Sequence, residues 1–159
     1  MNKSERIAYI SGIVDGEAYL GIKKSTWGMR NRKDVHNPTY SERIQIRMAC
    51  KPILEFIKNE FGGTVYTEKR IYNSEKGYTS RKIMSVYAAT DKKAYNFIKE
   101  IFPYLIEKKT QAECIIRLRK NKEKPESKMR GGKNRKKLMD SKIIVEREAL
   151  YQKCKDCHH

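Results

Sequence analysis

The chain has 159 residues, which suffice for one modest hydrophobic core but not for two independent ones. Its formal net charge is +17, and such an excess of Lys and Arg favours a polyanionic partner, nucleic acid above all. No apolar run is long enough for a membrane span, and the first residues lack the apolar stretch of a signal peptide. We therefore expect a protein that contacts no membrane, is not secreted, and stays in the cytoplasm or in the organelle that holds its host genome. Four cysteines in such a reducing compartment predict no disulfide framework.

The N-terminal segment, residues 5–15, has the spacing of a helix, and Ser4 is its expected N-cap. One face of this helix is aliphatic. A second face carries small residues, which let another backbone approach closely, so we expect it to pack against a further partner. This second face consists of Ala8, Ser11 and Gly12, with Asp15 at its end.

Alternating polar and apolar residues then predict four strands, at 18–23, 40–49, 64–72 and 81–90. Helices are expected at 52–61, 91–102 and 110–120, with a last helix capped by Asp140. The order predicts an α+β fold, αββαββα, with a curved four-stranded antiparallel sheet and its helices on one face. Residues 1–120 would form this domain, and 121–159 would add a basic arm and a C-terminal helix to it. The uncovered face of the sheet is the expected nucleic-acid surface.

The segment from Ile10 to Ala18, with the sequence ISGIVDGEA, resembles the nine-residue signature of the LAGLIDADG homing endonucleases. The order of the elements and the segment FPYLIEKK at 102–109, which leads into a helix, are also similar to the single-motif, homodimeric members. The resemblance extends over residues 5–120, although Ala18 replaces the last glycine of the signature.

This resemblance implies a homodimer in which the face formed by Ala8, Ser11, Gly12 and Asp15 meets its copy across a two-fold axis. It implies that Glu17 is the catalytic acid and a ligand of Mg²⁺, with Mn²⁺ able to substitute, and that the Gly16 carbonyl is a second ligand. Lys108 matches a lysine that stabilises charge near the phosphates. Asp15 is expected to be mainly structural. The residue that usually orders the attacking water maps onto Cys50 or Lys51, and neither is the usual glutamine.

Base contacts are expected from the outward side chains of the strands, because Arg and Gln can pair bidentately with base edges in the major groove. The strand residues are Tyr19, Lys23, Arg43, Gln45, Arg47, Tyr66, Glu68, Arg70, Arg81, Ser85 and Tyr87. The loop between the first two strands would add Trp27, Arg30, Arg32 and Lys33. Residues 120–137 include nine basic residues and predict a linker or a mobile arm that contacts phosphates.

We thus expect a site-specific double-strand DNA endonuclease of the intron- or intein-homing type, which cleaves a long, near-palindromic site by metal-dependent phosphodiester hydrolysis. The alternatives are a group I intron maturase, with its own intron RNA as partner, and a non-cleaving DNA-binding protein on the same scaffold. An acidic residue beside phosphate favours cleavage, since a pure binder needs no carboxylate there. The cysteines and histidines of 154–159 are more typical of a frayed terminus than of a zinc or haem site.

Overall fold

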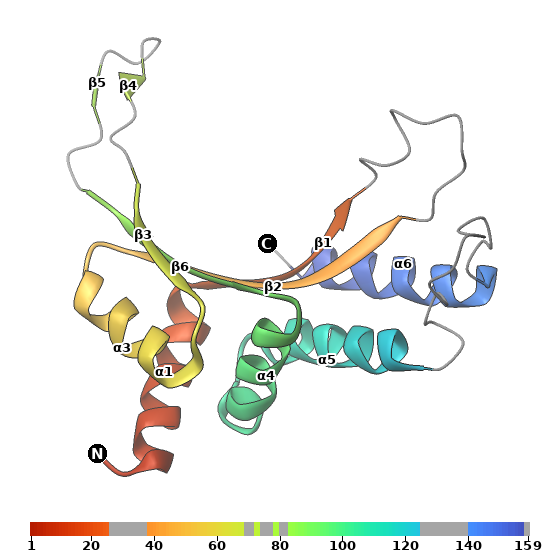
Figure 1. The fold of residues 1–159 in the computed structure, drawn as a ribbon, viewed down its shortest axis with the longest axis horizontal. Coiled ribbons are helices and arrows are strands. Elements are labelled where there is room, and N and C mark those ends of the chain that lie inside the picture. The colour runs from red at the N-terminus through yellow and green to blue at the C-terminus, as the bar shows by residue number, and fades with distance from the viewer. Residues whose placement is uncertain (26–37, 69–71, 74–77, 80–82, 125–139, 158–159) are drawn as a thin grey trace, which may run out of the picture.

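Five α-helices and a curved four-stranded antiparallel sheet make up the residues that the computed structural model describes (Figure 1). These residues are 1–25, 38–68, 72–73, 78–79, 83–124 and 140–157. The main elements are α1 (Lys3–Glu17), β1 (Ala18–Ser25), β2 (Thr39–Met48), α3 (Lys51–Phe61), β3 (Thr64–Thr67), β6 (Ser85–Thr90), α4 (Asp91–Ile101), α5 (Lys109–Glu123) and α6 (Ser141–Asp156). A short hairpin and a 3-10 turn are also present, formed by β4 (Tyr72–Asn73) with β5 (Tyr78–Thr79), and by η1 (Phe102–Tyr104).

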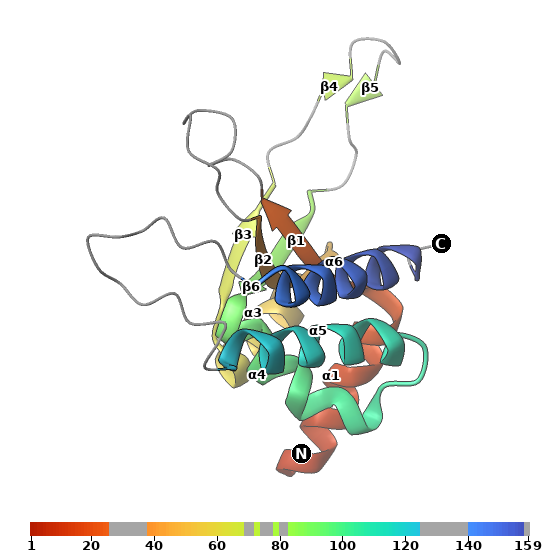
Figure 2. The same cartoon turned by 90° about the vertical axis from the view of Figure 1, so that its right-hand side faces the viewer.

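The strand order of the sheet is β1-β2-β6-β3, and every neighbouring pair is antiparallel. The helices gather on one side of the sheet, and within the described residues no helix lies over the other side (Figures 1 and 2). We call these two sides the covered face and the open face. The predicted fold class and the single layer of helices are therefore confirmed.

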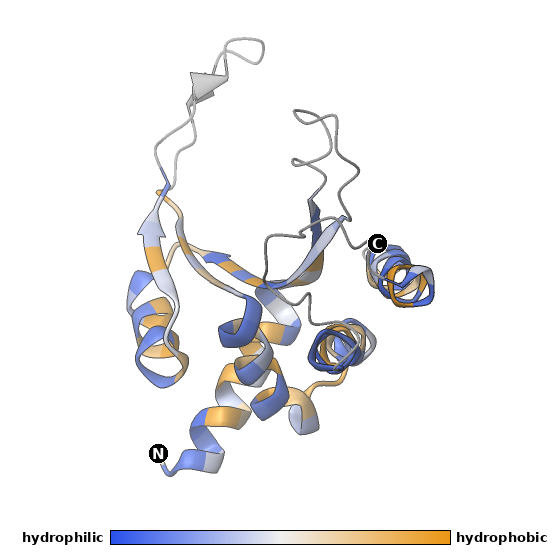
Figure 3. Ribbon diagram, turned by 45° about the vertical axis from the view of Figure 1, so that its right-hand side comes forward, coloured by the Kyte–Doolittle hydropathy of each residue, from blue (hydrophilic) through white to orange (hydrophobic). Residues whose placement is uncertain are grey.

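Hydrophobic and polar residues alternate along β1 and β2, and the register brings the two hydrophobic sets together (Figure 3). Ala18 pairs with Ile46 and Leu20 with Ile44, and none of these four side chains is more than 6% exposed. Because successive side chains of a strand point to opposite faces, the residues between them reach the open face.

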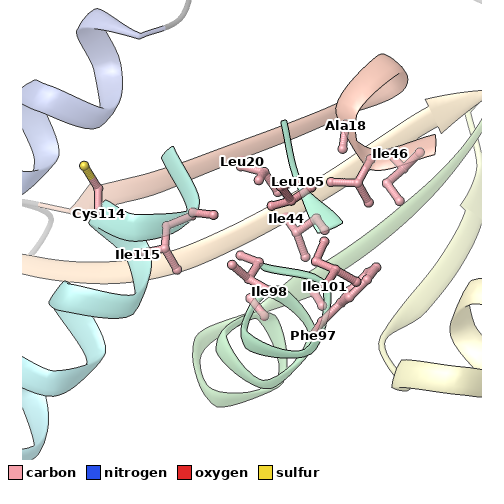
Figure 4. Packing of buried hydrophobic residues seen from close by; sticks show 14 of the residues in the cluster. Ala18, Leu20, Ile44, Ile46, Phe97, Ile98, Ile101, Leu105, Cys114 and Ile115 are labelled. Carbon is pink, nitrogen blue, oxygen red and sulfur yellow. The ribbon is translucent and has the colours of Figure 1, made fainter. Parts of the chain in front are cut away.

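The core lies between the covered face and the helices (Figure 4). α4 contributes Phe97, Ile98 and Ile101, and α5 contributes Cys114 and Ile115, all of them at most 1% exposed. Each large aliphatic or aromatic side chain that leaves water in this way contributes roughly 1.5–3 kcal/mol to folding. The apolar contacts between the sheet and these helices therefore hold the sheet in place.

α1 begins before the predicted cap, Ser4, because Asn2 and Glu5 form a reciprocal capping box. The Asn2 side chain accepts a hydrogen bond from the Glu5 backbone N–H, and the Glu5 carboxylate accepts one from the Asn2 backbone N–H, each at 2.9 Å. Ser4 lies inside the helix, so the predicted cap is wrong.

α3 ends at residue 61 as predicted, where Gly62 and Gly63 adopt φ angles of 71° and 94° that favour glycine. At Gly63 a Cβ atom would also come within 2.9 Å of the Tyr87 ring. The glycine pair therefore both ends the helix and lets β3 pass close to β6.

The C-terminal segment is a packed helix. α6 packs beside β1 and α5 (Figure 2), and its Leu150 and Cys154 side chains are 9% and 1% exposed. Asp140 caps the helix as predicted, because its side chain accepts a hydrogen bond from the Lys142 N–H at 2.9 Å. The interpretation of this segment as a frayed terminus is wrong for residues 154–157, because the Cys154 thiol packs into the core against the backbone of Leu20.

The predicted basic arm overlaps α5, which continues to Glu123. Residues 120–123 are therefore helical, and the remainder of the arm, 125–139, lies outside the described residues. In the described residues, no helix is long and apolar enough to cross a membrane.

Buried ionic groups join α5 to the sheet. The Glu42 side chain is fully buried on the covered face of β2, where its Oε2 lies 2.9 Å from Arg119 Nη2 and 2.8 Å from Lys122 Nζ. From α6, Arg147 donates from Nε to the Asn121 side chain at 2.7 Å. These polar contacts fix α5 and α6 relative to β2.

Candidate active site and nucleic-acid interface

Glu17 is the last residue of α1, and its carboxylate is exposed where the helix joins β1. The helix ends there because the backbone becomes extended at Ala18, whose side chain enters the core with 6% exposure. Ala18 has a φ of −88°, so the missing glycine of the signature causes no backbone strain. Within the described residues, no hydrogen bond or ion pair engages the Glu17 carboxylate.

Asp15 ties the end of α1 to the loop before α5. Its carboxylate accepts hydrogen bonds from the backbone N–H groups of Ile106 and Lys108, at 2.8 and 3.1 Å. The Lys108 ammonium donates in turn to the Asp15 carbonyl. These contacts agree with the structural role expected for Asp15, and they fix Lys108 at the end of the helix that carries Glu17.

The oxygen atoms at the end of α1 suit a hard cation. Glu17 offers a carboxylate that no described residue pairs with, and the exposed Gly16 offers a backbone carbonyl. Mg²⁺ prefers such ligands. The described residues contain no group of three or more His, Cys, Asp or Glu side chains that could hold a metal ion. This chain therefore fits as the source of part of a coordination shell, and the rest would come from water, from a phosphate or from a second chain.

The exposed side of α1 carries small residues. Ala8, Gly12 and Gly16 are exposed, and a Cβ atom added at either glycine meets nothing within 4 Å. Ser11, by contrast, is 1% exposed and donates its hydroxyl to the Ile7 carbonyl at 2.7 Å. Ser11 therefore faces its own chain and does not belong to the exposed small residues of α1.

Polar side chains occupy the open face of β1, β2 and β3. Arg43 donates from Nη2 to the Gln45 side chain at 2.8 Å, and Arg47 Nε lies 2.7 Å from the carboxylate of Glu68. The predicted contact residues that the register and burial assign to this face are Tyr19, Lys23, Arg43, Gln45, Arg47, Tyr66 and Glu68.

Tyr19 lies flat along β1 on this face. A Cβ atom at Gly21 would come within 2.5 Å of the Tyr19 hydroxyl, so the ring occupies the space that a side chain at position 21 would need. Burial raises the pKa of the Tyr19 phenol, which keeps it a neutral donor at physiological pH. Gly21 is therefore needed for the shape of the open face rather than for backbone conformation.

The expectation that Ser85 and Tyr87 face outward is wrong. Tyr87 pairs with Ile46, is fully buried and packs edge-on against Phe97, with ring centroids 5.8 Å apart. Ser85 is 4% exposed on the same covered face. By register the alternate residues, Val86 and Ala88, point toward the open face, although they are apolar and Val86 is itself 0% exposed. Polarity alone therefore points the other way.

The remaining predicted contacts cannot be placed, since Trp27, Arg30, Arg32, Lys33, Arg70 and Arg81 lie outside the described residues. Cys50 and Lys51 are exposed where β2 leads into α3. The sequence analysis missed Ile106, which is 87% exposed although Asp15 binds its backbone. Its position within the FPYLIEKK segment, next to the buried Leu105, was the available signal.

No family model matches the sequence, and no curated protein matches it significantly. Solved structures do match. The homing endonuclease I-CvuI, in complex with a DNA target in the presence of Mg, has a TM-score of 0.67 at 18% identity, over 97% of this chain and 82% of that one.

Two further structures give the same result. The LAGLIDADG homing endonuclease I-GzeII, in complex with a DNA target, has a TM-score of 0.62 at 19% identity, over 91% of this chain and 43% of that one. An archaeal intron-encoded homing endonuclease, I-Vdi141I, complexed with DNA, has a TM-score of 0.57 at 16% identity, over 94% of this chain and 98% of that one. The described residues therefore have the α+β fold of the LAGLIDADG homing endonucleases.

Proposed function

We propose that the chain is one subunit of a homodimeric, site-specific DNA endonuclease of the homing type, which hydrolyses phosphodiester bonds with the help of Mg²⁺. The observation that carries the proposal is the exposed carboxylate of Glu17 at the end of α1, which pairs with no described residue. Lys108 binds the Asp15 carbonyl near the same helix end. The net charge of +17 and the polar open face support a nucleic-acid partner. The similar structures are of homing endonucleases bound to DNA, and those of I-CvuI were determined in the presence of Mg or Ca.

The chemistry follows from the donors at the end of α1. A divalent cation held by Glu17 and the Gly16 carbonyl would polarise a phosphate and lower the pKa of a bound water. The Lys108 ammonium, fixed by Asp15, lies at the same helix end and would stabilise the negative charge that develops on the phosphate. The open face would hold the duplex and read its base edges through Arg43, Gln45 and Arg47.

A second copy of the chain is part of the proposal. Gly12 and Gly16 are exposed where their own chain has room for a side chain, as expected where another helix packs closely. Ile106, 87% exposed beside the end of α1, would lose its contact with water in such a dimer. Two copies would bring two Glu17 carboxylates together, and both strands of one duplex could then be cut.

The test is cleavage of the uninterrupted host-gene junction, incubated with Mg²⁺ or with Ca²⁺ and mapped on both strands. We expect Mg²⁺-dependent cuts in both strands. Glu17→Gln should abolish cutting while binding persists or tightens, because the change removes a metal ligand and also a negative charge near phosphate. Glu5→Gln is the matched control, because Gln preserves a capping box at the other end of α1.

Other outcomes decide against the proposal. Cutting by Glu17→Gln at the wild-type rate would overturn the assignment of the active site. Binding without cleavage by the wild type would indicate a non-cleaving DNA-binding protein. Tight binding to the folded intron RNA but not to the duplex would indicate a maturase.

A further inference from the structure

A pocket of about 280 Å³ lies where the open face meets α6. β1 and β2 form one side of it, and the last turns of α6 form the other. We call it the α6 pocket, and its main lining residues are Tyr19, Lys23, Arg43, Tyr151, Cys154 and Lys155. Because Tyr19, Lys23 and Arg43 also belong to the open face, the pocket continues that face onto α6.

The lining is basic. It includes four cationic side chains and no acidic one. One of the four, Lys24, is neutralised by the Glu148 carboxylate at 2.7 Å. Lys23, Arg43 and Lys155 form no ion pair with any described residue, and the Arg43 guanidinium donates to the uncharged Gln45 side chain. Three positive charges that no described residue neutralises therefore surround the pocket.

The rest of the lining is aromatic or apolar. Tyr19 and Tyr151 provide ring faces and phenol groups, and the buried Cys154 closes the inner end. Burial raises the pKa of the Cys154 thiol to about 12, so it adds no negative charge. The volume is slightly below the range of about 300–1,000 Å³ for pockets that hold drug-sized ligands, so it suits a phosphate and part of its sugar better than a large cofactor.

We propose that the α6 pocket binds a phosphate group of a nucleic-acid strand and so extends the nucleic-acid interface from the sheet onto α6. Lys23 and Lys155 can donate to phosphate oxygens from the sheet and from α6, and Arg43, proposed above to read a base, adds positive charge beside them. The proposal rests on the nucleic-acid binding proposed above, and it adds a contact that the sequence analysis did not include. Lys155 is the informative residue, because it belongs to the pocket but not to the sheet.

The experiment measures the affinity of the full chain for a fluorescent DNA duplex of arbitrary sequence over a series of salt concentrations. Lys155→Gln should weaken binding about fivefold and reduce the slope of log affinity against log salt by about 1, the value for one phosphate contact. Lys153→Gln, which removes the same charge from an exposed position of α6 outside the pocket, should change neither quantity appreciably. Lys155→Arg should retain the slope.

A second measurement separates a strand phosphate from a free one. Inorganic phosphate and a nucleoside monophosphate are titrated onto the wild type and Lys155→Gln while the NMR signals of the Tyr151 ring are followed. The duplex is titrated in the same way. The proposal is supported if the duplex shifts these signals in the wild type but not in Lys155→Gln.

If Lys155→Gln and Lys153→Gln weaken duplex binding equally, the proposal is overturned. Such a result would indicate that only the overall positive charge of α6 matters. Monophosphate binding that depends on Lys155, with duplex binding that does not, also overturns it in favour of a free nucleotide. If the wild type binds no duplex, the proposed function fails, and only Lys155-dependent monophosphate binding would support phosphate recognition by the pocket.

Discussion

At the scale of single residues, Lys108 has a structural contact with Asp15 and a proposed role in cleavage. Its backbone N–H binds the Asp15 carboxylate at 3.1 Å and its ammonium binds the Asp15 carbonyl, so the side chain is already oriented before any substrate arrives. We predict that Lys108→Met slows single-turnover cleavage of the target duplex by about 10²-fold or more, the usual effect of removing one preorganised donor. The affinity for the duplex should change little, because one charge of many is lost.

Lys109 provides the control for this prediction. It is the next residue and is exposed, and its ammonium lies over the Phe102 ring, 5.8 Å from the ring centroid. Lys109→Met should cleave at close to the wild-type rate. Equal losses in the two variants would show that net charge, and not the position of Lys108, determines the rate.

Glu42 is a second residue whose effect can be predicted. Its fully buried carboxylate balances Arg119 and Lys122, and removing one member of a buried ion pair leaves a charge without compensation. Glu42→Gln should therefore lower the free energy of unfolding by about 3–5 kcal/mol, measured by urea denaturation.

An exposed ion pair serves as the comparison for Glu42. Glu113 and Arg117 pair at 2.6 Å on the surface of α5, so Glu113→Gln should cost less than about 1 kcal/mol. Similar losses for Glu42→Gln and Glu113→Gln would contradict the assigned role of the buried carboxylate.

At the scale of elements, the attachment of α6 to β1 and β2 depends on pH. Hydrogen bonds from Lys24 and Tyr40 lower the pKa of Glu148 to about 2. In the unfolded chain the pKa of this carboxyl returns to about 4.3. The stabilisation of the fold by Glu148 is therefore complete above pH 4.3 and is lost as the pH falls toward 2. We predict that between these pH values the wild type loses about 1 kcal/mol more of its unfolding free energy than Glu148→Gln, the small figure reflecting solvent screening of this half-exposed group.

Glu55→Gln gives the reference for the acid titration. Glu55 pairs with Lys58 at 3.3 Å within α3, and no ion pair joins it to another described element. As the pH falls, the unfolding free energy of Glu55→Gln should decrease in parallel with that of the wild type. If Glu148→Gln also ran parallel to the wild type, the bond between α6 and the sheet would contribute nothing to acid stability.

β6 shows where prediction from the sequence reached its limit. Ser85 and Tyr87 are polar and lie two residues apart, so they share one face of the strand. Their polarity favoured the prediction that this face points outward. The face that a strand buries is nevertheless decided by what packs against it, here Phe97 of α4, which follows the strand in the chain. The same holds for α6, since its docking beside β1 depends on the Cys154 and Tyr151 contacts, and no local pattern encodes them.

The candidate site, which stays a prediction, needs less tertiary information than these faces because most of its residues lie in one short motif. Asp15, Gly16 and Glu17 are consecutive, so the end of α1 places them together once the helix is correctly predicted. Lys108 followed only from the resemblance, since its bond to Asp15 joins segments that are 93 residues apart. The burial of Ser11 depends on which side of α1 meets the core, and the spacing of small residues alone did not settle that.

At the scale of the whole molecule, the proposed dimer separates stability from activity. A Cβ atom at position 12 meets nothing within 4 Å, and Leu is a better helix former than Gly. Gly12→Leu should therefore raise the stability of the single chain by about 0.5–1 kcal/mol. It should also prevent close packing of two α1 helices, so sedimentation should show monomers and cleavage should be lost.

Asn96→Leu adds the same side chain at an exposed, uncharged position of α4 and should leave the dimer and its activity intact. A wild-type chain that sediments as a monomer and cleaves fully would contradict the shared site. Loss of stability in Gly12→Leu would show instead that the glycine is needed within its own chain.

The alternation of covered and open positions along β1 and β2 also bears on how such a protein can change during evolution. Arg43 and Gln45 can be exchanged without altering a core contact, because each lies between two buried neighbours on the opposite face, and Lys23 is itself exposed on the open face. Gly21 is the exception, since any larger residue there must displace the Tyr19 ring. A library that randomises the three polar positions and keeps Gly21 should therefore retain folded variants at high frequency, and new target preferences can arise by drift before selection acts on them.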